Sequence, residues 1–86
     1  MRTDFTKNFH RQYQKLPKKV QAKFAERVRL FIEDQTNPLL KVHSLMGEYS
    51  GCSSLNVTGD IRAVFKIQTK KIVLFIAIGS HSELYG

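Results

Sequence analysis

The chain has 86 residues, 42% of them hydrophobic, and a single cysteine, Cys52. It suits one domain over residues 1–86. It shows no apolar run of about 20 residues and no signal-peptide pattern, so we expect a cytoplasmic protein without membrane contact. The formal net charge is +7, and residues 1–29 carry all of it with nine basic and two acidic side chains, so we expect this third to attract a polyanion such as nucleic acid.

The N-terminal third is predicted to form two helices. One apolar stripe marks the first helix and consists of Phe5, Phe9, Tyr13 and Leu16. We expect Asp4 or Thr6 to cap its start, and Pro17 to separate it from the second helix. The second helix should end near Gln35, because Asn37 precedes a proline. Its expected core side chains are Val20, Phe24, Val28, Phe31 and Ile32.

The rest of the chain is predicted to form a small sheet. The expected strands are residues 53–57, 61–68 and 72–78, the last apolar on both sides. Side chains alternate along 61–68, with Ile61, Ala63, Phe65 and Ile67 facing one way and Arg62, Val64, Lys66 and Gln68 the other. Turns at 58–60 and 69–71 would join them, residues 38–52 are irregular, and residues 1–4 could add a short edge strand. The predicted fold class is α+β, with two N-terminal helices packed on one face of a small twisted, mainly antiparallel sheet.

A group of polar and titratable side chains comes from the non-helical part of the chain. Its members are Lys41, His43, Glu48, Asp60, Arg62 and His81. Arg62 begins one strand of a tight hairpin and His81 follows the other, so we expect both at one rim of the sheet, together with Asp60. Cleavage of RNA needs a base for the 2′-hydroxyl, an acid for the departing 5′-oxygen and a cation beside the phosphate, which this set would supply.

Each of these residues also has an ordinary structural interpretation. Arg62 could simply pair with Glu48 or Asp60 on the sheet surface, and His81 could be an exposed residue of a polar tail over 79–86. The His and Cys residues lack the close pairs of a zinc site, so we expect no metal.

Three segments carry a resemblance to a known family. They are residues 43–51 (HSLMGEYSG), 56–65 (NVTGDIRAVF) and 78–86 (IGSHSELYG). With them the chain resembles the RelE/ParE superfamily of toxins from toxin–antitoxin systems, and within it the YafQ-type mRNA interferases. The resemblance implies an endoribonuclease that enters the ribosomal A site and cuts mRNA by attack of the 2′-hydroxyl, without a metal or small-molecule cofactor. It also implies three partners, namely a cognate antitoxin, the small ribosomal subunit and mRNA.

The resemblance also implies roles for individual residues. His81 would be the general acid, Asp60 or His43 the base, and Arg62 the clamp on the phosphate. Further contacts to the RNA are expected from Lys41, Glu48, Tyr49, Asn56 and Tyr85. The basic helical face expected to dock on ribosomal RNA consists of Lys15, Lys18, Lys19, Lys23 and Arg27.

The chain departs from the YafQ-type pattern at two positions. Asn56 stands where these toxins have another histidine, and Ile61 where they have a tryptophan, so the base differs or turnover is slower. Two alternatives remain open at this point. One is a ParE-like toxin that poisons DNA gyrase without cutting nucleic acid and needs neither His81 nor Asp60. The other is a basic RNA-binding domain without activity.

Overall fold

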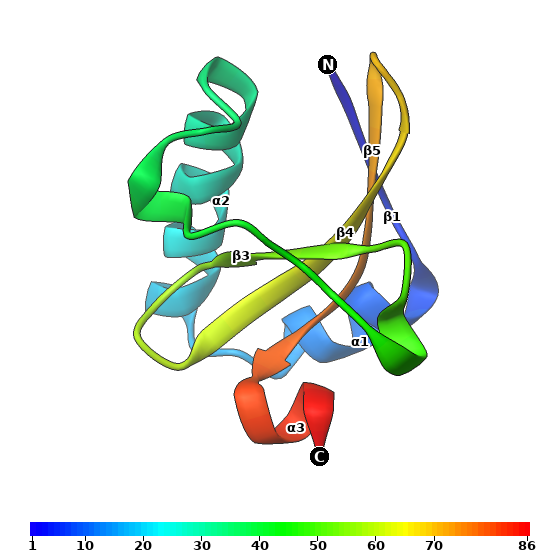
Figure 1. Cartoon of the computed structure of the whole chain (residues 1–86). Coiled ribbons are helices and arrows are strands. Elements are labelled where there is room, and N and C mark those ends of the chain that lie inside the picture. Colours follow the sequence, from blue (N-terminus) through cyan, green and yellow to red (C-terminus); the bar gives the residue numbers. More distant parts are fainter.

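A five-stranded mixed sheet of order β1-β5-β4-β3-β2 forms the centre of the computed structural model, which describes all 86 residues (Figure 1). The strands are β1 (Arg2–Phe5), β2 (His43–Ser44), β3 (Ser53–Asn56), β4 (Ile61–Thr69) and β5 (Ile72–Ser80). β1 pairs in parallel with β5, and all other neighbours are antiparallel. The predicted α+β class is confirmed, as is the N-terminal edge strand, although the strand runs one residue further than predicted.

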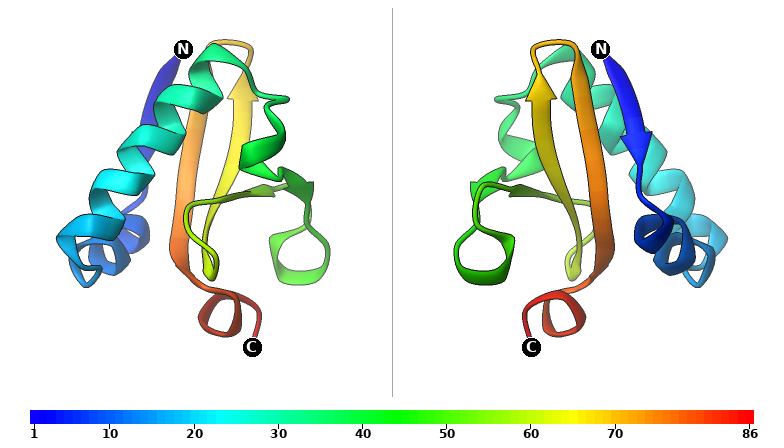
Figure 2. Two further views of the ribbon diagram at one scale, coloured as in Figure 1. Left: turned by 90° about the vertical axis from the view of Figure 1, so that its left-hand side faces the viewer. Right: turned by 90° about the vertical axis from the view of Figure 1, so that its right-hand side faces the viewer.

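Two helices cover one face of this sheet (Figure 2). They are α1 (Lys7–Gln14) and α2 (Lys18–Glu33). Thr6 caps α1, since its hydroxyl accepts a hydrogen bond of 3.0 Å from the Phe9 N–H, whereas Asp4 pairs with Arg2 at 3.1 Å. Pro17 precedes α2 as predicted, and α2 ends two residues before Gln35. No helix is long and apolar enough to cross a membrane.

The C-terminal segment differs from its prediction as a polar tail. Residues 79 and 80 complete β5, and the chain then turns into a short helix, α3 (His81–Tyr85). The reason is local, because Ser80 and Glu83 form a capping box and Leu84 is buried. The irregular segment 38–52 contains β2 and two single turns of 3-10 helix, η1 (Pro38–Leu40) and η2 (Gly47–Tyr49).

Aromatic side chains make the main core between the helices and the sheet. Phe24 of α2 meets Phe75 of β5 edge to face with ring centroids 5.2 Å apart, and Phe31 meets Phe65 of β4 at 4.9 Å. Edge-to-face geometry adds to the stabilisation that burial of these rings provides. α2 is therefore attached to the sheet through aromatic contacts.

A second, smaller core lies on the other side of the sheet. Val64 of β4 and Ala77 of β5 are fully buried there beneath Leu84 of α3, and Tyr49 and Cys52 pack against them. Because side chains of a strand alternate, Val64 faces away from the helices while Ala63 and Phe65 face them, as predicted. We call this second surface, centred on Val64 and Ala77, the open face.

Ile32, predicted for the core, and Ile67, predicted to face the same way as Ala63 and Phe65, are largely exposed. Ile32 is 45% exposed, because it follows Phe31 and so lies about 100° further round α2, away from the sheet. Ile67 is 43% exposed, because it lies in the part of β4 that extends towards the turn of the β4–β5 hairpin, where residues 66–69 are all exposed.

Side chains at the start of and within α1 form hydrogen bonds with the backbone of β5 beyond the point where β1 ends. β1 pairs with only the first half of β5. Beyond it, Thr6 Oγ1 and Asn8 Nδ2 donate to the Ile76 carbonyl at 2.9 and 3.2 Å, and Gln12 Oε1 accepts from the Ile78 N–H at 2.9 Å. These contacts satisfy backbone groups that would otherwise lack a strand partner and fix the end of β5 against α1.

We predict that the neighbours Phe31 and Ile32 differ strongly in their contribution to stability. Phe31→Ala should lower the free energy of unfolding by about 3–5 kcal/mol, because it leaves a cavity beside Phe65. Ile32→Ala, the matched control on the same turn of α2, should lower it by only about 0.5 kcal/mol. Urea unfolding followed by circular dichroism measures both values, and equal losses would contradict the assignment of Ile32 to the surface.

Candidate active site on the open face of the sheet

Strand register places Asn56 and Arg62 side by side on the open face. Arg62 of β4 is directly opposite Asn56 on β3 and Gly79 on β5. Directly opposite residues point to the same side of a sheet, and Arg62 is two residues before Val64, which belongs to the open face. A guanidinium and a neutral amide therefore lie next to one another on this surface.

The guanidinium of Arg62 is held by backbone carbonyls. Its Nη1 donates to the carbonyl oxygens of Thr58 and Gly59 at 3.3 and 3.1 Å, both in the β3–β4 turn. Neither Glu48 nor Asp60 forms an ion pair with it, because the two ion pairs of the chain are Arg2–Asp4 and Lys23–Glu26. The interpretation of Arg62 as one half of a surface ion pair is wrong. The group is fixed in position, and its positive charge is not neutralised by a carboxylate.

Three aromatic rings connect the η2 turn with α3. The rings of His81 and Tyr85 lie 4.9 Å apart, and the ring of Tyr85 meets that of Tyr49 edge to face at 6.1 Å. Burial, followed by the charge of Glu48, raises the pKa of the Tyr49 hydroxyl, which therefore stays protonated and uncharged at neutral pH. Tyr49 packs against Val64 and Ala77, so this row of rings borders the open face.

Asp60 lies at the rim where α3 begins. Ile61, the first residue of β4, pairs with Ser80, the last residue of β5, so Asp60 and His81 both flank this end of the hairpin. The register of the hairpin therefore brings the backbones of Asp60, Arg62 and His81 to one end of the sheet, and the meeting of their side chains stays a prediction.

His43 is far from this rim along the sheet. It lies opposite Ser54 on the edge strand β2, two strands from β4, which corresponds to about 10 Å across the sheet. Lys41, two residues earlier, is exposed with a left-handed backbone (φ 46°), and Glu48 is exposed in η2. The sequence alone did not distinguish Asp60 from His43 as the base. The strand register places Asp60 beside β4 and His43 on the edge strand β2.

Only part of the predicted basic face is exposed and without an ion-pair partner. Lys23 pairs with Glu26 at 3.5 Å, and Arg27 is half-buried with its Nε directed at the Val57 carbonyl at 3.5 Å. The remaining members are exposed at the junction of α1 and α2, and they are Lys15, Lys18 and Lys19. α2 starts there with no acidic residue in its first turn and no side-chain cap, so its unpaired N–H groups add to the positive potential.

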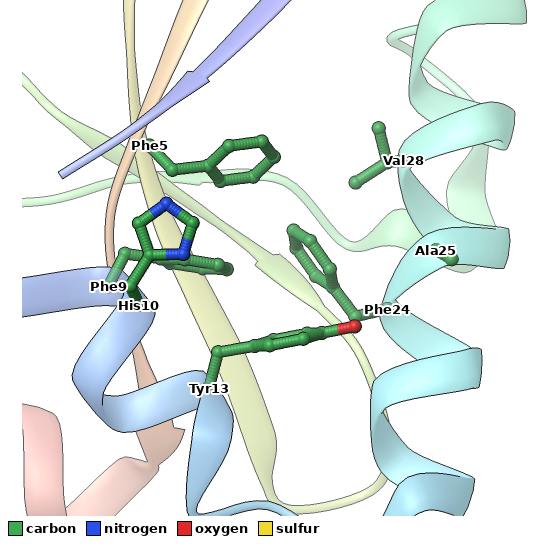
Figure 3. Close-up of a pocket in the computed structure, with 7 residues that line it drawn as sticks. All are labelled: Phe5, Phe9, His10, Tyr13, Phe24, Ala25 and Val28. Atoms are coloured by element: carbon green, nitrogen blue, oxygen red, sulfur yellow. The ribbon is translucent and has the colours of Figure 1, made fainter. Parts of the chain in front are cut away.

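The largest cavity of the molecule lies on the helical side. It has a volume of about 340 Å³ and is almost entirely apolar. Its lining comes from β1, α1 and α2 and consists of Phe5, Phe9, His10, Tyr13, Phe24, Ala25 and Val28 (Figure 3). Without a carboxylate or guanidinium, this groove suits apolar side chains rather than a phosphodiester. Phe9 and Phe24 belong to the core, as the sequence predicts, and they also line this groove together with the exposed residue Ala25.

Comparisons with known proteins agree with this fold. A family model described as a bacterial toxin of type II toxin–antitoxin system, YafQ, matches residues 1–86. The crystal structure of YafQ from E. coli strain BL21(DE3) aligns with a TM-score of 0.82 and 20% identity over 99% of this chain and 98% of that one. No curated protein sequence matches significantly.

Two further structures are similar. YafQ in the E. coli DinJ–YafQ toxin–antitoxin complex aligns with a TM-score of 0.79 and 21% identity, over 99% of this chain and 97% of that one. The YoeB/ParE toxin from Agrobacterium tumefaciens aligns with a TM-score of 0.78 and 20% identity, over 94% and 99%. These likenesses show a shared fold, and the match of the family model over the whole chain shows the family. The chain belongs to the YafQ family of bacterial toxins from type II toxin–antitoxin systems.

Proposed function

We propose that this toxin is a ribosome-dependent endoribonuclease that cuts mRNA in the ribosomal A site and so stops translation in the cytoplasm. The observation that carries the proposal is the position of Arg62. Its guanidinium is fixed by two carbonyls, has no carboxylate partner, and belongs to the strand end beside which His81 begins α3. A phosphate bound there would have a forked cation and an imidazole beside it.

The reaction uses groups of this chain alone. Asp60 takes the proton of the ribose 2′-hydroxyl as the oxygen attacks the adjacent phosphorus, and Arg62 stabilises the additional negative charge on the phosphate. The bond to the 5′-oxygen then breaks, and His81 in its protonated form donates a proton to that oxygen. The products are a 2′,3′-cyclic phosphate and a free 5′-hydroxyl. We assign the base to Asp60 because it directly precedes β4, which carries Arg62, whereas His43 lies two strands from β4.

The surroundings of the rim supply contacts for the mRNA. Tyr85 is 37% exposed beside His81, and with Tyr49 it offers aromatic surface on which a base can stack. Asn56, next to Arg62, carries an amide that donates to phosphate or ribose oxygens but does not titrate. Lys41 and Glu48, exposed on the segment before β3, would contact the nucleotides on either side.

We predict that His81→Ala and Arg62→Ala each lower the rate of mRNA cleavage by about 10²–10⁴-fold without unfolding the protein, because His81 is exposed and Arg62 contributes no core surface. Primer extension on mRNA from an in-vitro translation reaction measures the new 5′ ends. Lys70→Ala, in the exposed turn at the opposite end of the β4–β5 hairpin, is the control and should cleave normally.

The same assay distinguishes the alternative functions. Arrest of translation without new 5′ ends would contradict cleavage and favour a binding toxin. Arrest of DNA replication, with translation intact, would favour a ParE-like action on gyrase.

We also propose that the α1–α2 junction docks on ribosomal RNA. The charge reversals Lys18→Glu and Lys19→Glu together should weaken binding to ribosomes and flatten its dependence on salt, because fewer phosphate counterions are released. The same changes should stabilise the fold by about 0.3–1 kcal/mol each, since they place acids at the positive end of α2. Ribosome pelleting between low and moderate salt, with thermal unfolding in parallel, measures both effects.

The matched control is Lys70→Glu with Lys71→Glu, which changes the net charge equally at a distant turn. Equal losses of ribosome binding in both double variants would show that net charge alone matters and would contradict docking through the junction.

We further propose that the cognate antitoxin uses the apolar groove between α1 and α2. The partner is an acidic amphipathic segment, because the groove lies within the third of the chain that carries the whole net charge of +7. Val28 and the exposed Ile32 continue the apolar surface along α2 beyond the groove. A cavity less than half this size, about 150 Å³, already accommodates a benzene ring, so one or two side chains fit here.

We predict that Ala25→Arg weakens antitoxin binding by about tenfold or more, because the long side chain fills the groove without removing a core contact. Mixing each variant with the cognate antitoxin, in titration calorimetry, measures the affinity. Ala22→Arg, one turn earlier on the same helix and outside the groove, is the control. Cleavage should be normal in both variants, and unchanged affinity in Ala25→Arg would contradict this docking site.

A further inference from the structure

Two residues of the candidate site, His81 and Tyr85, lie on the very short helix α3. It comprises five residues at the end of the chain, too few for a helix that is stable on its own. Only Leu84 anchors it to a core, while His81 and Tyr85 are exposed. The ring of Tyr85 adds an edge-to-face contact with Tyr49, and the direction of this short helix otherwise depends on how the chain leaves β5.

A reciprocal pair of hydrogen bonds defines that turn. The Ser80 N–H donates to Glu83 Oε1 at 2.8 Å, and the Glu83 N–H donates to Ser80 Oγ at 3.2 Å. The bond from the Ser80 backbone is the main cause of a lowered pKa of Glu83, so the carboxylate is ionised at neutral pH and acts only as an acceptor. The pair fixes the position of His81 between its two members.

Gly79 leaves room for this side chain. A Cβ atom placed on Gly79 would lie 3.2 Å from Glu83 Oε1, closer than such atoms normally approach, so the carboxylate would have to shift by a few tenths of an ångström. The backbone of Gly79 does not have a positive φ, so alanine would suit the strand conformation itself. The close approach of Glu83 is therefore the feature of the structure that favours glycine at this position.

α1 supports the same corner from the other side. A small cavity of about 210 Å³ separates α1 from the start of α3, and Gln12, Lys15 and Glu83 are among the residues that line it. Gln12 Oε1 accepts a hydrogen bond of 2.9 Å from the Ile78 N–H. The positive charge of Lys15 favours the ionised form of Glu83. The end of β5 is thus fixed directly before the capping box.

We propose that Glu83 is a positioning residue, which reaches back over Gly79 to the Ser80 N–H and so directs His81 and Tyr85 of α3 towards the scissile phosphate. The inference rests on the proposed cleavage of mRNA and adds two residues, Glu83 and Gly79, that do not touch the substrate. Glu83 acts here as a hydrogen-bond acceptor, and its negative charge is not required.

Two substitutions at Glu83 distinguish its role as a hydrogen-bond acceptor from the effect of its negative charge. Glu83→Ala removes the acceptor and should lower kcat for mRNA cleavage by about tenfold or more, since a small misplacement of a catalytic group is costly, while KM and the thermal unfolding midpoint change little. Glu83→Gln keeps an acceptor at the same distance, as glutamine does in capping boxes, and should restore kcat to within about threefold. Glu33→Ala, an exposed acid at the end of α2, is the matched control and should behave as wild type.

A double-mutant cycle tests the role of Gly79. Gly79→Ala should lower kcat about as much as Glu83→Ala, because it displaces the carboxylate. The double variant should be no slower than Glu83→Ala alone, since both changes disrupt one interaction. Additive losses would overturn the link between the two residues. Wild-type kcat in Glu83→Ala, or a loss in Glu83→Gln as large as in Glu83→Ala, would overturn the positioning role.

Hydrogen exchange of the Glu83 and Gly86 amides, compared with the core amides of β4 and β5, gives a readout that does not depend on cleavage. Glu83→Ala should raise exchange only in α3, and Glu83→Gln should not. If the wild-type protein does not cut mRNA at all, the proposed function fails, and this measurement still decides whether Glu83 orders α3. Unchanged exchange in Glu83→Ala would overturn the inference even where cleavage is observed.

Discussion

The pairing of β4 with β5 is the constraint on which the arrangement of the site depends. Ile61 opposite Ser80, and Arg62 opposite Gly79, bring two segments from distant parts of the sequence to one rim. A slip of one residue would turn Arg62 to the helical side and Val64 out of its small core. The apolar residues of both faces therefore fix the register, and the register in turn determines which polar groups meet.

The two faces of the sheet carry different candidate binding surfaces. Aromatic packing attaches α1 and α2 to one face, and the basic junction and the apolar groove lie on this side. The opposite face has a core of three buried side chains and leaves its polar rim accessible. Separate faces would let one molecule bind RNA phosphates through its helices and position a single phosphodiester at the sheet rim.

Local patterns in the sequence predicted most of the fold. The helical stripe, the break at Pro17 and the alternation along 61–68 depend on neighbouring residues, and the structure contains each of them. Ile32 and Ile67 were predicted wrongly because their exposure depends on where the helices end relative to the sheet, which no local pattern contains. α3 was missed because its capping box lies within a segment that is otherwise polar. The hairpin pattern was enough to predict that Asp60, Arg62 and His81 lie at one end of the sheet. The separation of His43 from that end could be known only from the strand order.

Several features of the molecule are not explained by the stability of the fold. Lysines begin α2 at its positive end, Arg62 lacks a carboxylate partner, and Ile32 and Tyr85 expose apolar surface. Elsewhere the local rules are followed, since Thr6 caps α1 and no buried side-chain polar atom lacks a hydrogen bond. Departures from local rules concentrate where a sequence is selected for binding or chemistry. The lysines at the α1–α2 junction and Arg62 at the rim lie where a polyanion and a phosphodiester would supply the missing contacts, whereas the most exposed apolar side chains, Met46 and Leu39, lie in the segment 38–52.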